Sequence, residues 1–292
     1  MSQKSKGNSQ NNDDIRKKFI YGLMLLKGDG VTQDKKVGIK LIKEAADKGY
    51  PDAMYHYGTM LDGGNEVPVN KRGAALYYKL AADVGSLEAM HNYAVMLKNG
   101  DGIPQNKEDA ADYFKMAADN GQQEAMVNYS LMLDEGDGIP TDKKEALRYM
   151  KMAADSGHVK GMYNYGIMLK DSDNQDDKIE GAEYIQKAAE KGHPAAEMLY
   201  GLLLFKGDVV QQNKNDGLSY LKKAADAGFP NAQEYYDHYS RDPEPENLPA
   251  VNNAQQRSQN NNDNSKNQNN NESQPNTGRE TNNNSSKCCL LI

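Results

Sequence analysis

The chain has 292 residues, of which only 37% are hydrophobic, and this indicates that part of it does not build a packed core. Its formal net charge of −7 argues against nucleic acid as a partner, because contacts from Lys and Arg to phosphates dominate that kind of binding. No apolar run approaches the roughly 18–20 residues that span a bilayer, and the N-terminus lacks the apolar core of a secretory signal, so we expect a cytosolic protein.

In chain order, the composition predicts a short disordered segment, a helical segment and a disordered tail. Residues 1–12 and 241–287 are rich in Asn, Gln and Ser and poor in large apolar residues. Ordering such segments costs more entropy than burial can offset. Residues 13–240 instead carry apolar residues at a helical period. We expect at least twelve helices and no strand in this segment.

Three markers recur in register through residues 13–240. A tyrosine returns every 36 or 35 residues, at Tyr21, Tyr57, Tyr93, Tyr129, Tyr165, Tyr200 and Tyr236. An Ala-Ala pair follows each of the first six tyrosines, and a glycine closes each unit, at Gly49, Gly85, Gly121, Gly157, Gly192 and Gly228. Periods of this length are typical of solenoids of stacked helical units.

Residues 88–121 show how one unit is built. The first helical stripe consists of Ala89, Met90, Tyr93, Met96 and Leu97, and the second of Ala110, Tyr113, Phe114, Ala117 and Ala118. Between the stripes, Gly100-Asp101-Gly102 predicts a turn. Gly121 stands where a left-handed residue ends a helix. Each unit is therefore predicted to be an antiparallel pair of helices.

This pattern resembles the Sel1-like repeat, a relative of the tetratricopeptide repeat. The third unit carries the features of that family: Ala89, Tyr93-Ala94, the Gly-x-Gly turn, Ala110 and the closing Ala117-Ala118-x-x-Gly121. The resemblance covers about residues 13–240. It implies an all-α fold, a right-handed α-solenoid of about six 36-residue helix-turn-helix repeats, with a concave face that binds proteins. The fifth unit departs from the family, because Asp171-Ser172-Asp173-Asn174 replaces the Gly-x-Gly turn.

By analogy with the tetratricopeptide unit, three rows of first-helix residues are expected to line the concave groove. The first row is Tyr55, His91, Val127, Tyr163 and Met198. The middle row is Thr59, Val95, Leu131, Ile167 and Leu202, and the third is Asp62, Lys98, Asp134, Lys170 and Phe205. An apolar row beside alternating charges suits a peptide or a helix as the partner. Ordinary packing between helices, with solvated charges, is the alternative.

The tail is expected to be a spacer that ends in a lipidation motif at residues 288–292. Residues 251–287 contain one large aliphatic residue, and a free chain of that length reaches roughly 40 Å. The last residues, Cys288-Cys289-Leu290-Leu291-Ile292, hold the only two cysteines. They predict a prenylation box with Cys289 as the acceptor, the alternative being a chance apolar stub. One prenyl chain anchors weakly, so we expect a second attachment: palmitoylation of Cys288 or a membrane-bound partner.

No motif predicts a catalytic, metal or cofactor site. The segment from Asp134 to Glu145 has the length of a calcium loop, but Gly136, Gly138 and Ile139 replace its ligands and its central glycine. The five histidines lack a metal-ligand spacing, and there is no glycine-rich phosphate loop. We therefore expect no enzyme, no cofactor and no metal.

Together these features predict a non-catalytic scaffold or adaptor on the cytosolic face of a membrane, with protein partners and a lipid anchor. The combination is similar to that of fungal chitin-synthase activators, so activation or recruitment of a membrane enzyme is a narrower form of this hypothesis. One alternative is a soluble, chaperone-like or regulatory peptide-binding module whose C-terminus is unmodified. The other alternative is an enzyme.

Overall fold

The computed structural model describes the backbone of residues 2–241 and the side chains from residue 12 onward. Over this range the chain forms thirteen α-helices and no strand, which confirms the all-α prediction. The helices are α1 (Ser2–Lys27), α2 (Lys35–Asp47), α3 (Pro51–Gly63), α4 (Lys71–Asp83), α5 (Leu87–Asn99), α6 (Lys107–Asp119), α7 (Gln123–Glu135), α8 (Lys143–Asp155), α9 (Val159–Lys170), α10 (Gln175–Glu190), α11 (Pro194–Lys206), α12 (Lys214–Asp226) and α13 (Ala232–Arg241).

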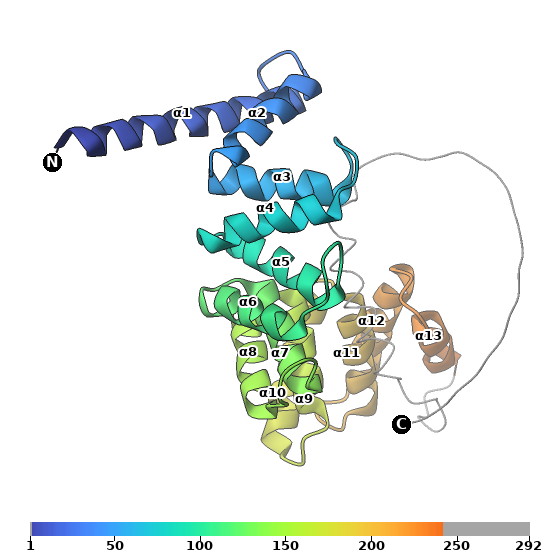
Figure 1. The fold of residues 1–292 in the computed structure, drawn as a ribbon. Helices are drawn as coiled ribbons and strands as arrows, with labels where there is room; N and C mark the ends of the chain where they lie inside the picture. Colours follow the sequence, from blue (N-terminus) through green and yellow to red (C-terminus); the bar gives the residue numbers. More distant parts are fainter. Residues whose placement is uncertain (1, 242–292) are drawn as a thin grey trace, which may run out of the picture. The chain divides into compact units, whose positions relative to one another are not determined.

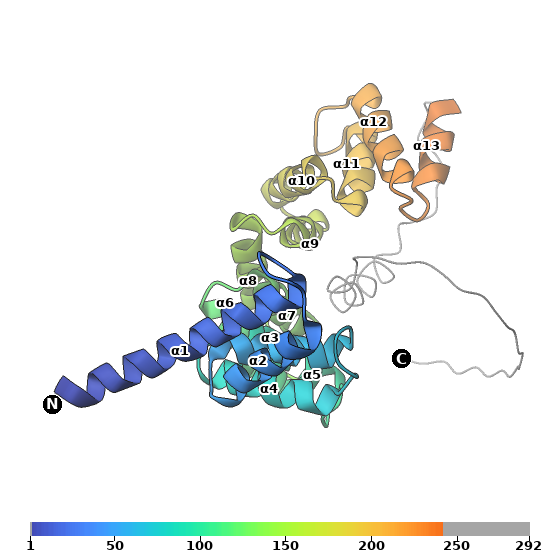
Figure 2. The ribbon, with the colours of Figure 1, turned by 90° about the horizontal axis from the view of Figure 1, so that it is seen from above.

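Each helix packs against the helices that precede and follow it in the sequence (Figure 1). The first twelve helices form six pairs, α1 with α2 through α11 with α12, and α13 packs on α12 (Figure 2). Packing between sequence neighbours is what defines a solenoid. The predicted α-solenoid of about six repeats is therefore confirmed.

The closing Ala-Ala-x-x-Gly marker forms the C-terminal cap of each second helix. In α6, Gly121 N donates to Ala118 O at 3.0 Å, and Gln122 N donates to Ala117 O at 3.0 Å. These two bonds make a Schellman motif, which places Gly121 in the left-handed region at φ +93°. The same two bonds recur in the other five units. Gln122 also caps the start of α7, so one short turn ends a helix and begins the next.

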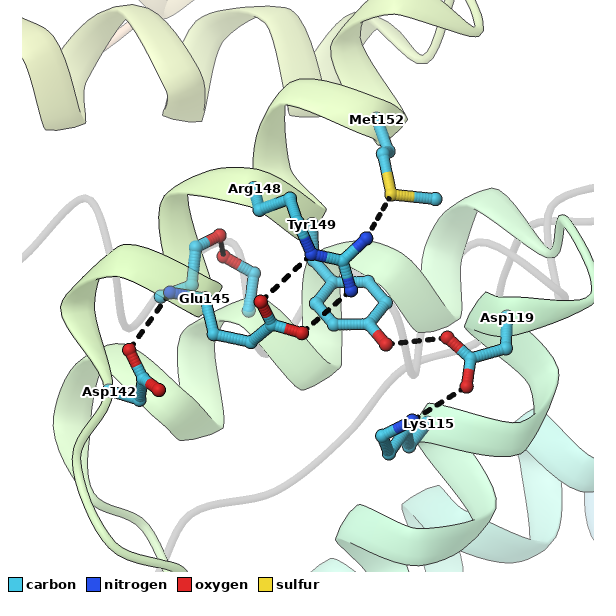
Figure 3. A network of polar contacts seen from close by, with 9 residues as sticks. Lys115, Asp119, Asp142, Glu145, Arg148, Tyr149 and Met152 are labelled. Atoms are coloured by element: carbon cyan, nitrogen blue, oxygen red, sulfur yellow. Dashed lines mark hydrogen bonds and ion pairs between the residues drawn. The ribbon is translucent and has the colours of Figure 1, made fainter.

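The marker tyrosines join the two helices of a unit. In the second to the sixth unit, the marker tyrosine packs edge-to-face against a second-helix tyrosine, with ring centroids 4.9–5.2 Å apart. Some second-helix tyrosines also reach the preceding unit. Tyr77 Oη of α4 donates to Asp47 of α2 at 2.5 Å, and Tyr149 of α8 donates to Asp119 of α6 (Figure 3). Tyrosines therefore connect helices both within and between units.

The two ends of the described chain and the fifth unit depart from the regular repeat or from its prediction. The composition of residues 1–12 predicts disorder, but α1 begins at Ser2. Adding residues to an existing helix is far easier than starting one, so the helix of residues 13–27 can extend backwards. The first helix of the fifth unit does not end in a left-handed glycine, as its sequence predicts: α9 ends at Lys170, and Asp171 has φ −100°. The predicted disorder of residues 241–287 falls almost wholly outside the described residues.

Candidate functional site

The first row of predicted groove residues lies where neighbouring helices meet. Val127, Tyr163 and Met198 are at most 5% exposed, whereas Tyr55 and His91 are half-buried. His91 Nε2 lies 2.9 Å from Asn128 Nδ2 of the next unit. The Tyr163 ring stacks on His193, also in the next unit, with centroids 4.8 Å apart. This row therefore contributes mainly to packing between units, and only its N-terminal members reach the surface.

The middle row offers more exposed apolar surface. Val95, Leu131 and Ile167 come from three consecutive units and are each half-buried. Thr59 continues the row but is engaged, because its Oγ1 donates to Tyr55 O at 3.0 Å and accepts from Tyr78 Oη at 3.3 Å. Leu202, at the other end, is buried. The structure thus brings three aliphatic side chains to one surface at equivalent positions.

All four charged residues of the third row form ion pairs within the chain. These residues do not present free charges to a partner, because each would have to give up an existing contact first. Phe205, the fifth member, is 2% exposed and packs on Tyr239, with ring centroids 4.2 Å apart. The ion pairs are Asp62–Lys71 at 2.7 Å, Lys98–Asp137 at 3.6 Å, Asp134–Lys143 at 2.8 Å and Lys170–Asp171 at 2.7 Å.

The aspartates of the Asp-Gly loops connect one unit to the previous one. Asp101 contacts Lys71 at 3.0 Å, and Asp137 contacts both Lys107 and Lys98. Burial raises the pKa of Asp137, but the Lys107 and Lys98 ammonium groups outweigh it and hold the pKa below its ordinary value. Among residues 12–241, no group of three or more His, Cys, Asp or Glu side chains is placed to hold a metal ion.

His158 and His193 are N-terminal caps of α9 and α11. Nδ1 of His158 accepts a hydrogen bond from Gly161 N at 3.0 Å, and Nδ1 of His193 accepts one from Ala196 N at 3.3 Å. A ring nitrogen that accepts must be unprotonated, so each cap requires a neutral imidazole. Burial, assisted by Lys160, lowers the pKa of His193 to about 4. Both histidines therefore have a structural role near neutral pH.

Glu197, which is not among the residues predicted above, replaces a methionine at a buried position. In units two to five the residue three before the marker tyrosine is Met54, Met90, Met126 or Met162, each at most 7% exposed. Glu197 stands three residues before Tyr200 and is also 7% exposed. Burial raises the pKa of Glu197, and Lys223 offsets only part of this rise. Comparing the units position by position reveals this residue in the sequence.

We expect Glu197→Met to increase the free energy of unfolding by about 1–2 kcal/mol at neutral pH, because burying a methionine is favourable and burying a carboxylate is not. The raised pKa means that the folded chain holds this proton more tightly than the unfolded chain. Above the pKa of Glu197 in the folded chain, its carboxylate therefore destabilises the fold. This penalty vanishes when the pH falls below the pKa of the residue in the unfolded chain, about 4.

Urea unfolding at neutral and acidic pH measures this trend. The gain from Glu197→Met should shrink as the pH falls. Glu183→Met, at an exposed position of α10, is the matched control and should show no such dependence. An equal gain from Glu197→Met at both pH values would show that its carboxylate is not penalised by burial.

Two sequence predictions concern attachment to a membrane: the lipidation motif and the absence of a membrane-spanning segment. The lipidation residues Cys288 and Cys289 lie outside the described residues. In the described part of the chain, no helix is both long enough and apolar enough to cross a membrane.

Comparison with known proteins agrees with the units seen in the structure. The Sel1 repeat model matches residues 19–50, 51–86, 87–122, 123–158, 159–193 and 194–229. Each match after the first begins at the first residue of a first helix, so sequence and structure define the same units. A comparison with curated proteins gave no match.

Two solved structures are similar to this chain. One is a protective antigen from uropathogenic Escherichia coli with an SLR fold (TM-score 0.71, 24% identity), matched over 77% of this chain and 48% of that one. The other is a Sel1 repeat protein from Oxalobacter formigenes (TM-score 0.69, 28% identity), matched over 76% of this chain and 64% of that one. This chain thus spans about half of the first protein and under two thirds of the second. The first likeness concerns the fold alone.

Proposed function

The chain belongs to the Sel1 repeat family, and on that premise we propose that it is a non-catalytic protein-interaction scaffold, held on the cytosolic face of a membrane by a lipid on Cys289. The observation that carries the proposal is the row of half-buried aliphatic side chains, Val95, Leu131 and Ile167, at equivalent positions of three consecutive units. A row of this kind gives a partner several equivalent apolar contacts in register.

The spacing of the row indicates which partner would fit. Side chains of successive first helices meet, as His91 of α5 and Asn128 of α7 do at 2.9 Å. We therefore expect equivalent residues of successive units to lie roughly one helix diameter apart, about 10 Å. Two turns of an α-helix advance about 11 Å. A partner helix with apolar residues seven positions apart could therefore place one side chain against each of Val95, Leu131 and Ile167. Lys98, close to the row, would need to leave Asp137 before it could bind an acidic group.

The attachment to a membrane is proposed from the C-terminal residues. Cys289 is followed by two aliphatic residues and Ile292, the arrangement of a prenylation box. Cys288 would take a palmitoyl group as the second attachment. A scaffold attached in this way would activate or recruit a membrane enzyme by keeping it near the repeats. Without the lipid, the same repeats would act as a soluble regulatory peptide-binding module.

Partner capture by full-length protein tests the row. Leu131→Asp should reduce recovery of bound proteins about tenfold, because a carboxylate would enter the middle of an apolar contact. Ile179→Asp is the matched control, since Ile179 is an exposed aliphatic residue of α10 outside the row, and it should leave capture unchanged. Circular dichroism melting curves must confirm that both variants fold. Equal capture by Leu131→Asp and the parent chain would exclude the row as the binding surface.

A further inference from the structure

α4 and its C-terminal cap carry an exposed apolar stripe. Leu76, Leu80 and Val84 are spaced by four residues, so they share one face of the helix, and they are 57%, 41% and 57% exposed. Met116 of α6, 49% exposed, occupies the position of Leu80 one unit later. It extends the stripe towards the neighbouring second helix. None of these residues belongs to the rows described above.

The stripe is specific to the second unit. Two other units fold with charged residues at all three positions, so packing of the repeat does not require apolar residues there. Clustered exposed apolar side chains of this kind mark interaction surfaces. The equivalent residues are Lys40, Glu44 and Lys48 in the first unit, and Glu183, Lys187 and Lys191 in the fifth.

The second helices on either side of the stripe carry opposite charges. Lys36 and Lys40 are exposed on α2, and Glu108 and Asp112 are exposed at the same positions of α6, two units later. Within the described part of the chain, none of these four residues forms an ion pair, although other residues of both helices do. The apolar stripe therefore runs between a basic edge and an acidic edge.

This charge pattern is complementary to itself in one orientation. If two copies met with α4 antiparallel, α2 would face α2 and α6 would face α6, and like charges would oppose each other. If α4 is parallel, with the two-fold axis along the helix, α2 of each copy faces α6 of the other. Lys36 and Lys40 then lie at the same height as Glu108 and Asp112 of the second copy. Complementary charges of this kind set orientation and suppress wrong pairings.

We infer that the chain forms a parallel homodimer about a two-fold axis along α4. Leu76, Leu80 and Val84 pack against their own equivalents, and α2 pairs with α6 of the second copy. The two copies of Arg72, at the start of the stripe, come close to each other across the axis. Each is flanked by Glu108 of its own chain and Glu108 of the second copy, which offsets the repulsion between the two guanidinium groups. Such an interface is isologous, as in most soluble dimers.

The size of the surface predicts a weak dimer. Three helices of 13 residues, each about 20 Å long and about 10 Å apart, present about 600 Å² per chain. Stable interfaces bury about 800 Å² per partner, so this dimer should dissociate in the micromolar range. If the proposed lipid anchor is present, the dimer carries two anchors, and two together hold a membrane far longer than one.

Single cysteines test the position and orientation of the interface. In a Cys288→Ser/Cys289→Ser background the chain has no other cysteine. Leu76→Cys should form a disulfide-linked dimer under mild oxidation, because the two copies of residue 76 face each other across the axis. Ile179→Cys, at an exposed position of α10, should stay monomeric. In an antiparallel pair centred on Leu80, residue 76 would lie opposite residue 84. Linkage at Leu80→Cys without linkage at Leu76→Cys would therefore overturn the orientation.

Charge reversal in the same unlipidated background tests the pairing of α2 with α6. Lys40→Glu and Asp112→Lys each place like charges opposite each other twice per dimer, and each should weaken association about tenfold in sedimentation velocity at low salt. When the two variants are mixed, the acidic side chain at position 40 of one variant faces the basic side chain at position 112 of the other. The remaining pair keeps its native Lys40 and Asp112, so a heterodimer should form with parental strength. A parent chain that stays monomeric at high concentration, or no recovery on mixing, would overturn the homodimer. Because no lipid is involved, either result leaves the proposed membrane anchor untouched.

Discussion

Gly138→Ala is expected to lower the free energy of unfolding by about 3 kcal/mol, whereas Gly121→Ala should lower it by about 1 kcal/mol. Both glycines have positive φ, +83° and +93°, which costs any other residue about 1 kcal/mol. Only Gly138 lies against another unit: a Cβ there would be 2.3 Å from Cβ of Lys107 at the start of α6. Overpacking of this kind adds about 1–3 kcal/mol. Nothing lies within 4 Å of a Cβ at Gly121.

Chemical denaturation of the two variants measures the difference, and Gly121→Ala serves as the control for backbone strain alone. A solenoid is stabilised by the contacts between adjacent units, so a clash at one of these contacts should reduce cooperativity as well as stability. Equal costs for the two substitutions would mean that the turn does not pack against α6. Gly102 has the same relation to Lys71 one unit earlier, so Gly102→Ala should behave like Gly138→Ala.

Cys289→Ser should move most of the protein from the membrane fraction to the soluble fraction. The substitution removes the proposed acceptor thiol, and no lipid processing can follow. Cys288→Ser is the informative comparison. It should leave the prenyl group in place and shorten residence on the membrane, because a single lipid chain binds reversibly. Fractionation and fluorescence recovery of tagged full-length chains measure both effects. A Cys289→Ser chain that stays on the membrane would show that a bound partner, not a lipid, holds it there.

The sequence alone was sufficient for the architecture because the determinants of each unit are local. The Ala-Ala-x-x-Gly marker encodes a cap whose two hydrogen bonds span only six residues, from Ala117 to Gln122. The edge-to-face tyrosine pairs are also local, since each pair joins residues about 20 positions apart, such as Tyr57 and Tyr77. The closing marker recurs in all six units, which makes the pattern easy to recognise in the sequence.

The surface was harder to predict because it depends on how each unit is rotated on the previous one. The period places Lys98 and Asp134 in one row, but it does not show that Lys98 contacts Asp137 and that Asp134 contacts Lys143. Nor does it show that Tyr163 is covered by His193. Position-by-position differences between units were the better guide, because both Glu197 and the stripe on α4 are departures from the shared pattern.

Intact-mass analysis of the protein from its native cell, combined with membrane fractionation, measures lipidation and location in one sample. A membrane-tethered scaffold should be recovered mainly with membranes, with a prenyl group on Cys289 and with protein partners that the Leu131→Asp variant fails to retain. An unmodified Cys289 on a chain found wholly in the soluble fraction would contradict the tether and leave a soluble binding module.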